Sequence, residues 1–366
     1  KRPSYLDQEG KSPFGTDTRG CNPEFEQFTF SPLEIKDINR IIPMGRMGGD
    51  HITPTDHTYF KAQPWNQDPV PKDVLSPGEG FLVKIERLNF QSFADQPSQT
   101  DYNLVLEHSC NVFTNFIHIT ELSEKIQKKL GTLQPGNNRN VRIPLEAGES
   151  LGVIKLLPEY ESIQLYQFDF SVSDTRNIAS GIVNLDNDFY TRTEPWKRFI
   201  SDPFAYFIAE IKSQLEAKTV RSIEPIGGKI DYDIDGKLIG NWFKEDTRVY
   251  KGLSEDQPYW SAHLSVVYDT FDPTQIRVSI GDFGGEGRQF GVAGNAPTPE
   301  GIDVATGTVK YELRSFEYYI GDTYQKWDAG KYAENIKSQA SNVRSWGHKV
   351  KPHKVKRCSL ISNNIA

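Results

Sequence analysis

Apolar and polar residues alternate in short segments along much of the chain, and this alternation predicts a mainly β protein. A period of two residues is typical of strands that bury one face. In the first half of the chain the alternation occurs in 81–85, 104–108, 113–119 and 141–145. We expect these segments to form one antiparallel β domain over residues 35–175, after an extended polar arm over residues 1–34.

One segment of this first domain has helical spacing instead. Leu122, Ile126 and Leu130 lie four residues apart and place their side chains on one face of a helix. Thr120 can cap the first turn, and Gly131 can end the last. We therefore expect a short helix between these two residues.

A second domain is predicted over residues 188–320. Asp202-Pro203 is typical of a helix start, and apolar residues follow at helical spacing as far as Leu215. Strand patterns then occur in 229–243, 259–269, 275–281 and 307–319. Gly240-Asn241-Trp242 is similar to the Gly-x-Trp of lipocalin-like barrels. We expect an antiparallel, barrel-like domain with one helix, whose open end could take a small apolar ligand.

Composition and charge narrow the possible partners. The net charge of −7 and the pI near 5.6 argue against nucleic acid, which binds to basic surfaces. No apolar run reaches the 18 or so residues of a membrane-spanning helix, so the chain is not expected to be transmembrane. Residues 321–366 carry nine Lys or Arg against three Asp or Glu, and we expect them to form a flexible basic tail.

The three cysteines, Cys21, Cys110 and Cys358, are far apart in the sequence. This spacing fits neither a zinc ribbon nor a disulfide framework. It leaves open one disulfide with a free thiol or three thiols. Low Met, high Tyr and Phe, and many Pro and Gly favour an extracytoplasmic protein, secreted or at the cell surface.

The segment 49–60 concentrates groups that can bind a metal ion. His51, Asp56 and His57 lie within seven positions, next to Pro54, which stiffens the backbone. Imidazole and carboxylate groups at short spacing are typical ligands of zinc. A zinc site needs at least one further ligand from another part of the chain.

The order of signals over residues 37–175 resembles the lysostaphin-type (M23, LytM-like) metallopeptidase domain. Asn115-Phe116-Ile117-His118-Ile119-Thr120 is similar to the family's Tyr-x-His-Leu-like segment, and 147–152 is similar to its Gly-x-x-(Ile/Leu)-Gly turn. The resemblance implies an antiparallel β-core and a zinc ion bound by an early His, a following Asp and a late His. It also implies that His118 lines the cleft and stabilises the oxyanion.

The chain departs from the family at the reactive positions. The family has three residues between its early His and Asp, but four residues separate His51 from Asp56, so His57 is an alternative ligand. Where the family has His-x-His, this chain has Gln167-Phe168-Asp169. The implied metal set is therefore His51, Asp56 or His57, and Asp169, with zinc as its metal. Gln167 in the catalytic position cannot accept a proton at neutral pH.

Asp231-x-Asp233-x-Asp235-Gly236 matches the first half of a calcium loop. The twelfth position, where such a loop has a bidentate acid, is Trp242. A hairpin turn at Asp235-Gly236 explains the same residues, and calcium is not an expected cofactor.

These patterns favour a degenerate peptidase-like protein that binds without hydrolysing. We expect an extracytoplasmic binding or structural protein whose partner is a cell-surface polymer, a peptide or a small apolar ligand. An active zinc-dependent hydrolase with an unusual ligand set is the alternative. A third hypothesis is a homo-oligomer in a filament or surface layer, joined through the polar arm and the basic tail.

Overall fold

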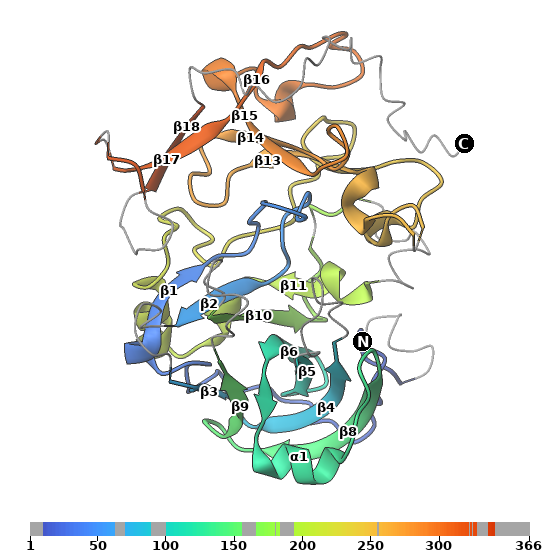
Figure 1. The fold of residues 1–366 in the computed structure, drawn as a ribbon, viewed down its shortest axis with the longest axis vertical. Coiled ribbons are helices and arrows are strands. Elements are labelled where there is room, and N and C mark those ends of the chain that lie inside the picture. The colour runs from blue at the N-terminus through green and yellow to red at the C-terminus, as the bar shows by residue number, and fades with distance from the viewer. Residues whose placement is uncertain are drawn as a thin grey trace, which may run out of the picture.

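The computed structural model describes residues 10–62, 70–88, 100–155, 166–179, 181–183, 194–254, 256–321, 323, 325–327 and 336–340. In this part of the chain strands dominate, and the α-helices are the short α1 (Glu124–Leu130) and α3 (Ala209–Glu216). Figure 1 shows several sheets arranged along the long axis of the molecule. The prediction of a mainly β protein is confirmed.

The largest sheet has eight strands in the order β1-β2-β10-β6-β5-β4-β8, with β11 beside β10. Neighbouring strands in it are antiparallel. The segments expected at 81–85, 104–108, 113–119 and 141–145 are its strands β4, β5, β6 and β8. The bounds are β1 (Ile38–Ile42), β2 (Thr58–Ala62), β4 (Gly80–Arg87), β5 (Tyr102–Glu107), β6 (Val112–Ile119), β8 (Asn138–Leu145), β10 (Gln167–Asp174) and β11 (Ile200–Ser201).

One face of this sheet forms the main hydrophobic core. Phe60 on β2 and Phe168 on β10 are fully buried there, with stacked rings 5.2 Å apart. Burying rings of this size contributes a large part of the stability of such a core. A three-stranded sheet of β3 (Lys72–Leu75), β9 (Ser150–Ile154) and β7 (Glu121–Leu122) packs on the same core. Helix α1 adds Ile126 and Leu130, and Gly131 ends it with a φ of 66°.

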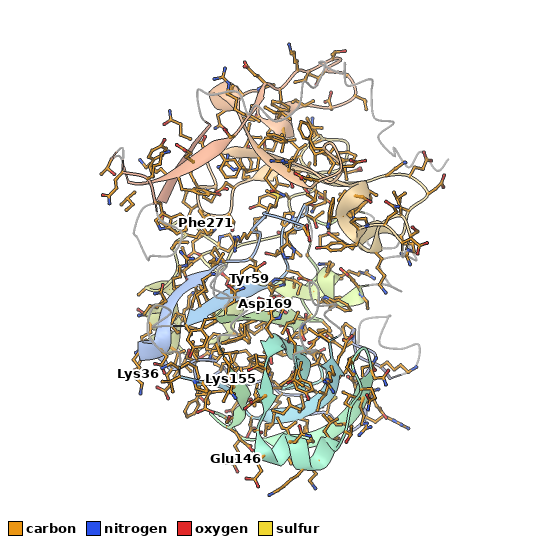
Figure 2. All side chains as sticks on the ribbon, in the orientation of Figure 1. Lys36, Tyr59, Glu146, Lys155, Asp169 and Phe271 are labelled. Carbon is orange, nitrogen blue, oxygen red and sulfur yellow. A yellow bond between two sulfur atoms is a disulfide. The ribbon has the colours of Figure 1, made fainter. Side chains whose placement is uncertain are left out.

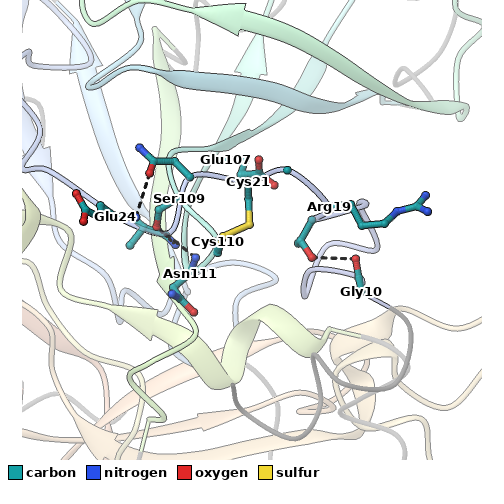
Figure 3. The surroundings of a disulfide bond; sticks show 12 residues. Gly10, Arg19, Cys21, Glu24, Glu107, Ser109, Cys110 and Asn111 are labelled. Carbon is teal, nitrogen blue, oxygen red and sulfur yellow. Dashed lines mark hydrogen bonds between the residues drawn. A yellow bond between two sulfur atoms is a disulfide. The ribbon is translucent and has the colours of Figure 1, made fainter. Parts of the chain in front are cut away.

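Segments from both ends of this region complete the core. Phe28, in the predicted extended arm, is fully buried, and Cys21 forms a disulfide with Cys110 across 89 residues of sequence (Figure 3). Phe204 and Leu215, in the helix expected to open the second domain, also pack in this core. That helix is interrupted. A 3₁₀ turn over Pro203–Tyr206 follows the capping carboxylate of Asp202, and α3 begins only after an extended residue.

The second unit is an open antiparallel sheet. Its order is β12-β13-β14-β15-β16, and within the described residues β12 pairs only with β13 and β16 only with β15, so they form no closed barrel. A two-stranded sheet of β17 and β18 adjoins it. The bounds are β12 (Gly240–Phe243), β13 (His263–Tyr268), β14 (Ile276–Ile280), β15 (Arg288–Val292), β16 (Leu313–Arg314), β17 (Phe316–Ile320) and β18 (Ile336–Ala340).

The prediction that the segments on either side of Asp235-Gly236 pair as a hairpin was wrong. The chain does turn there, but the segment 229–234 forms no ladder with the strand that follows, because β12 pairs with β13. The carboxylate of Asp233 instead accepts hydrogen bonds from the backbone N–H groups of Asn241 and Val183. Most of the predicted basic tail, residues 341–366, lies outside the described residues.

The two units meet beside strands β1 and β2. Tyr59 on β2 packs in one cluster with Phe271 and Trp327 of the second unit. The Thr270 hydroxyl donates a hydrogen bond of 2.6 Å to the carbonyl oxygen of Met44. Figure 2 shows Tyr59 and Asp169 close together, at the level where the lower and upper parts of the molecule join. Among the described helices, none has the length and apolar character needed to cross a membrane.

Candidate functional site

The second face of the eight-stranded sheet carries the candidate site in its polar part around Asp169, while Val105 and Phe113 on the same face pack with Phe14 in a separate apolar cluster; the polar part is called the polar face below. Successive residues of β10 alternate between the faces, so Phe168 and Phe170 enter the core while Gln167 and Asp169 face the other way. Asp169 lies opposite Tyr59 on β2 and opposite Ile117 on β6. It is 5% exposed and occupies the middle of the sheet, so its charge is shielded from bulk water.

A β-bulge brings His118 to the same face. In the pairing of β5 with β6, Tyr102 lies opposite Ile119 and Asn103 lies opposite Ile117, so His118 is the extra residue. Its φ of 75° is in the left-handed region, which is uncommon for residues other than glycine. Bulges redirect side chains and occur next to functional sites. Without this one, strict alternation would turn the imidazole of His118 into the core.

Two histidines converge on one oxygen of Asp169. Its Oδ2 lies 3.2 Å from Nε2 of His57 and 3.5 Å from Nε2 of His118. Behind them, Nδ1 of His57 is 3.0 Å from Oδ1 of Asp56, and Nδ1 of His118 is 2.7 Å from Oδ2 of Asp101. Carboxylates and imidazoles therefore alternate in a continuous buried cluster, which we call the Asp169 cluster: Asp56, His57, Asp169, His118 and Asp101.

The carboxylates favour the charged form of both imidazoles. Burial lowers the pKa of His118, but the carboxylates of Asp169 and Asp101 outweigh it and raise this pKa to about 9. Burial also opposes the charged form of His57, and Asp169 and Asp56 raise the pKa of His57 above its ordinary value. His118 is therefore an imidazolium at neutral pH, and the charged form of His57 is favoured.

Asp56 accepts hydrogen bonds from three donors, His57, Lys197 and Trp196. Its Oδ2 accepts from Nζ of Lys197 at 2.9 Å and from Nε1 of Trp196 at 3.1 Å, while Oδ1 accepts from His57. Burial raises the pKa of Asp56, but Lys197 and His57 outweigh it and lower this pKa well below the usual range. Asp56 is thus a carboxylate that orients His57.

His51 lies at the edge of the cluster. Its ring centroid is 6.0 Å from that of His57, and burial together with the nearby His57 lowers its pKa to about 4, so it is neutral. The second unit fixes the loop that carries it. Tyr259 donates its hydroxyl hydrogen to the Asp50 carbonyl at 3.2 Å, and Gln289 donates from Nε2 to the Gly49 carbonyl at 3.2 Å.

The geometry bears on the metal set that the resemblance implies. His57 and Asp169 come together, whereas Asp56 faces Lys197 and His51 makes ring contact only with His57. In the described part of the chain, no three His, Cys, Asp or Glu side chains are grouped so that they could hold a metal ion. One feature nevertheless fits a zinc site. Both clustered histidines have a carboxylate on Nδ1, which is the usual support of a metal-bound imidazole.

Several acceptors on this face lack a donor. Among the described residues, no hydrogen bond reaches Oδ1 of Asn103, Asn115 or Asp169, or Oε1 of Gln167, although all four atoms are buried. By register all four side chains are on the polar face. Buried acceptors are normally paired, and a group of unpaired ones is typical of a place where water or a ligand binds. We call this the acceptor row.

The sequence analysis did not identify Asp101 and Lys197, the two outer members of the charge network. Asp101 immediately precedes β5, and the pairing of β5 with β6 is what brings it to His118. Lys197 lies more than a hundred residues from Asp56, in a 3₁₀ turn over Pro195–Phe199. No local signal marks either residue.

Comparison of the chain with models of known protein families and with curated proteins gives no match. The resemblance to the M23 domain therefore rests on the residues named above.

Proposed function

We propose that the chain is an extracytoplasmic binding protein, built on a degenerate M23-like domain that does not hydrolyse its ligand. The ligand is a peptide or a cell-surface polymer, and it binds along the polar face of the eight-stranded sheet. The observation that carries this proposal is the Asp169 cluster, in which carboxylates fix His57 and His118 and favour their charged forms.

The same face offers hydrogen-bond acceptors to such a ligand. The acceptor row can take hydrogens from peptide N–H or sugar O–H groups. A buried acceptor left unpaired costs about 1–3 kcal/mol, so a ligand that pairs several of them gains affinity. The antiparallel sheet keeps these groups in fixed positions, which lowers the entropy lost on binding.

Hydrolysis lacks a general base in this arrangement. A base must accept a proton near neutral pH, and the amide of Gln167 cannot do so. His118 already holds its proton because its pKa is raised to about 9.

The disulfide supports the extracytoplasmic part of the proposal. Cys21 and Cys110 join the N-terminal arm to the start of β6, and such bonds persist in oxidising compartments. In a reducing compartment this link between arm and sheet would be lost.

Calorimetric titration with pentaglycine, a minimal peptide-like probe, tests the proposal. We expect saturable binding and no cleavage by mass spectrometry, with affinity reduced at least about tenfold in Gln167→Leu and in His118→Ala. Gln127→Leu is the matched control, because that amide lies on the exposed face of α1. Cleavage of the probe, or binding that is unchanged in both Gln167→Leu and His118→Ala, would contradict the proposal.

A zinc hydrolase is the second candidate, and the paired carboxylates of His57 and His118 favour it. As placed, these side chains do not form a metal-holding group. If a zinc ion displaced the two Nε2 protons and drew the side chains together, His57, His118 and Asp169 would hold it, and the metal would supply Lewis-acid activation of water. This candidate predicts that zinc allows pentaglycine cleavage and that Asp169→Asn abolishes it. An intact probe after incubation with zinc excludes it for this peptide.

A further inference from the structure

A group of cations lies on the polar face next to the Asp169 cluster. Lys61 is two residues after Tyr59 on β2, so both side chains are on the same face. In register, Lys61 lies between Gln167 on β10 and Arg40 on β1. Arg46 is also close, because its guanidinium lies over the ring of Tyr59 at 5.6 Å from the centroid.

Lys61 has no acceptor in the part of the chain that the structure describes. No hydrogen bond joins its ammonium group to another described residue, and no carboxylate there lies within ion-pair distance. Its side chain is only partly exposed, although lysines are rarely buried without a partner. Burial, Arg40 and Arg46 lower the pKa of Lys61 to about 7, because each of them disfavours a further positive charge.

The nearest anion does not neutralise these cations. Asp169 favours the charged form of Lys61, but less than burial and the two arginines oppose it. Its own charge is already shared by His57 and His118. Like charges held together in a half-buried place raise the free energy of the folded protein, and an anion bound there would lower it.

We propose that Lys61 and Arg46 bind a carboxylate group of the ligand at this end of the polar face. The inference rests on the proposed function, because it identifies the chemical class of the ligand that occupies the acceptor row. A guanidinium over Tyr59 and an ammonium two residues further along the same strand offer two cationic donors to a planar carboxylate. The buried Gln167 side chain, opposite Lys61, continues from this point into the acceptor row. The ligand is therefore a peptide whose carboxylate is at Lys61 and whose amide groups lie along β10.

Pentaglycine with a free carboxylate and the same peptide as its C-terminal amide test this assignment. We expect the acid to bind at least about tenfold more tightly than the amide, and Lys61→Met to abolish that preference. Lys128→Met, an exposed lysine on α1 with 72% of its side chain accessible, should leave the preference intact. Equal binding of acid and amide, or a preference that survives in Lys61→Met, overturns the assignment.

A second measurement separates failure of this subsite from failure of the proposed function. The protein is labelled with ¹³C at lysine Cε, and its lysine NMR signals are followed as the pH is changed, once in acetate and once in acetamide. The signal of Lys61 is identified as the one that is missing from the spectrum of Lys61→Met. We expect acetate to raise the pKa of Lys61 and acetamide to leave it unchanged, whether or not pentaglycine binds. A Lys61 pKa that does not respond to acetate overturns the carboxylate site by itself.

Discussion

The ion pair between His118 and Asp101 makes a pH-dependent contribution to stability that can be measured directly. Burial opposes the charge on His118, but Asp169 and Asp101 raise its pKa from the ordinary 6.5 to about 9. This difference corresponds to about 3 kcal/mol of stabilisation. Because the pKa is raised in the folded state, the full contribution is present below pH 6.5 and is lost as the pH rises through about 9.

Asp101→Asn removes one of the two carboxylates that cause this shift. The carboxylate of Asp169 still raises the pKa of His118 in this variant. We therefore expect the variant to lose about 1–2 kcal/mol of unfolding free energy at pH 6. At pH 10 the imidazole of His118 is neutral, and the wild type then contains a largely buried Asp101 without a charged partner. The stability difference should therefore disappear or change sign.

Urea unfolding at pH 6, 8 and 10 measures this difference for wild type and variant. Asp73→Asn is the matched control, since Asp73 is exposed on β3 and its contact is the hydroxyl of Ser150. The control should differ little from wild type at any of the three pH values. A destabilisation by Asp101→Asn that is equal at pH 6 and pH 10 would refute the assigned charge on His118.

Three further predictions concern other parts of the structure. Lys197→Met leaves Asp56 buried without its ammonium partner and should lower the unfolding free energy by about 3–5 kcal/mol. The double variant Lys197→Met with Asp56→Asn should regain part of this stability. An equal loss in the double variant would contradict the pairing. Cys110→Ser removes the disulfide with Cys21, which spans 89 residues of sequence, and should lower the unfolding free energy by about 4 kcal/mol. A wild-type Tm that does not change when a reductant is added would argue against this disulfide. Phe168→Ala should lower the unfolding free energy by about 3–5 kcal/mol because the Phe168 ring is fully buried. Phe30→Ala, whose side chain is 45% exposed, should lower it much less in the same urea assay. Similar losses in the two variants would contradict the burial of Phe168 in the core.

The positions of the strands were predicted from the sequence better than the pairing between strands. Alternation located β4, β5, β6 and β8, and Gly131 marked the end of α1, because these signals are local. The pairing of the segment before Asp235 was predicted wrongly, since β12 finds its partner in β13 instead. A turn sequence does not specify which strands it joins when a more distant strand offers a longer ladder.

The candidate site was predictable only in part. The sequence identified His57, His118 and Asp169 through their spacing and through the family resemblance, and the structure brings these three together. It did not identify Asp101 or Lys61, because each acts through a neighbour on another strand. The bulge at His118 is also not visible in the sequence, although it decides which face the imidazole occupies.

The central claim is that the Asp169 cluster holds protons on both histidines and serves for binding. Titration of the purified protein with zinc at pH 7 in a calorimeter, in two buffers of different ionisation enthalpy, tests this claim most directly. We predict no stoichiometric binding at micromolar zinc, because the metal would have to displace the protons of His57 and His118. One zinc ion bound per chain, with about two protons released and with the binding lost in Asp169→Asn, would contradict the claim.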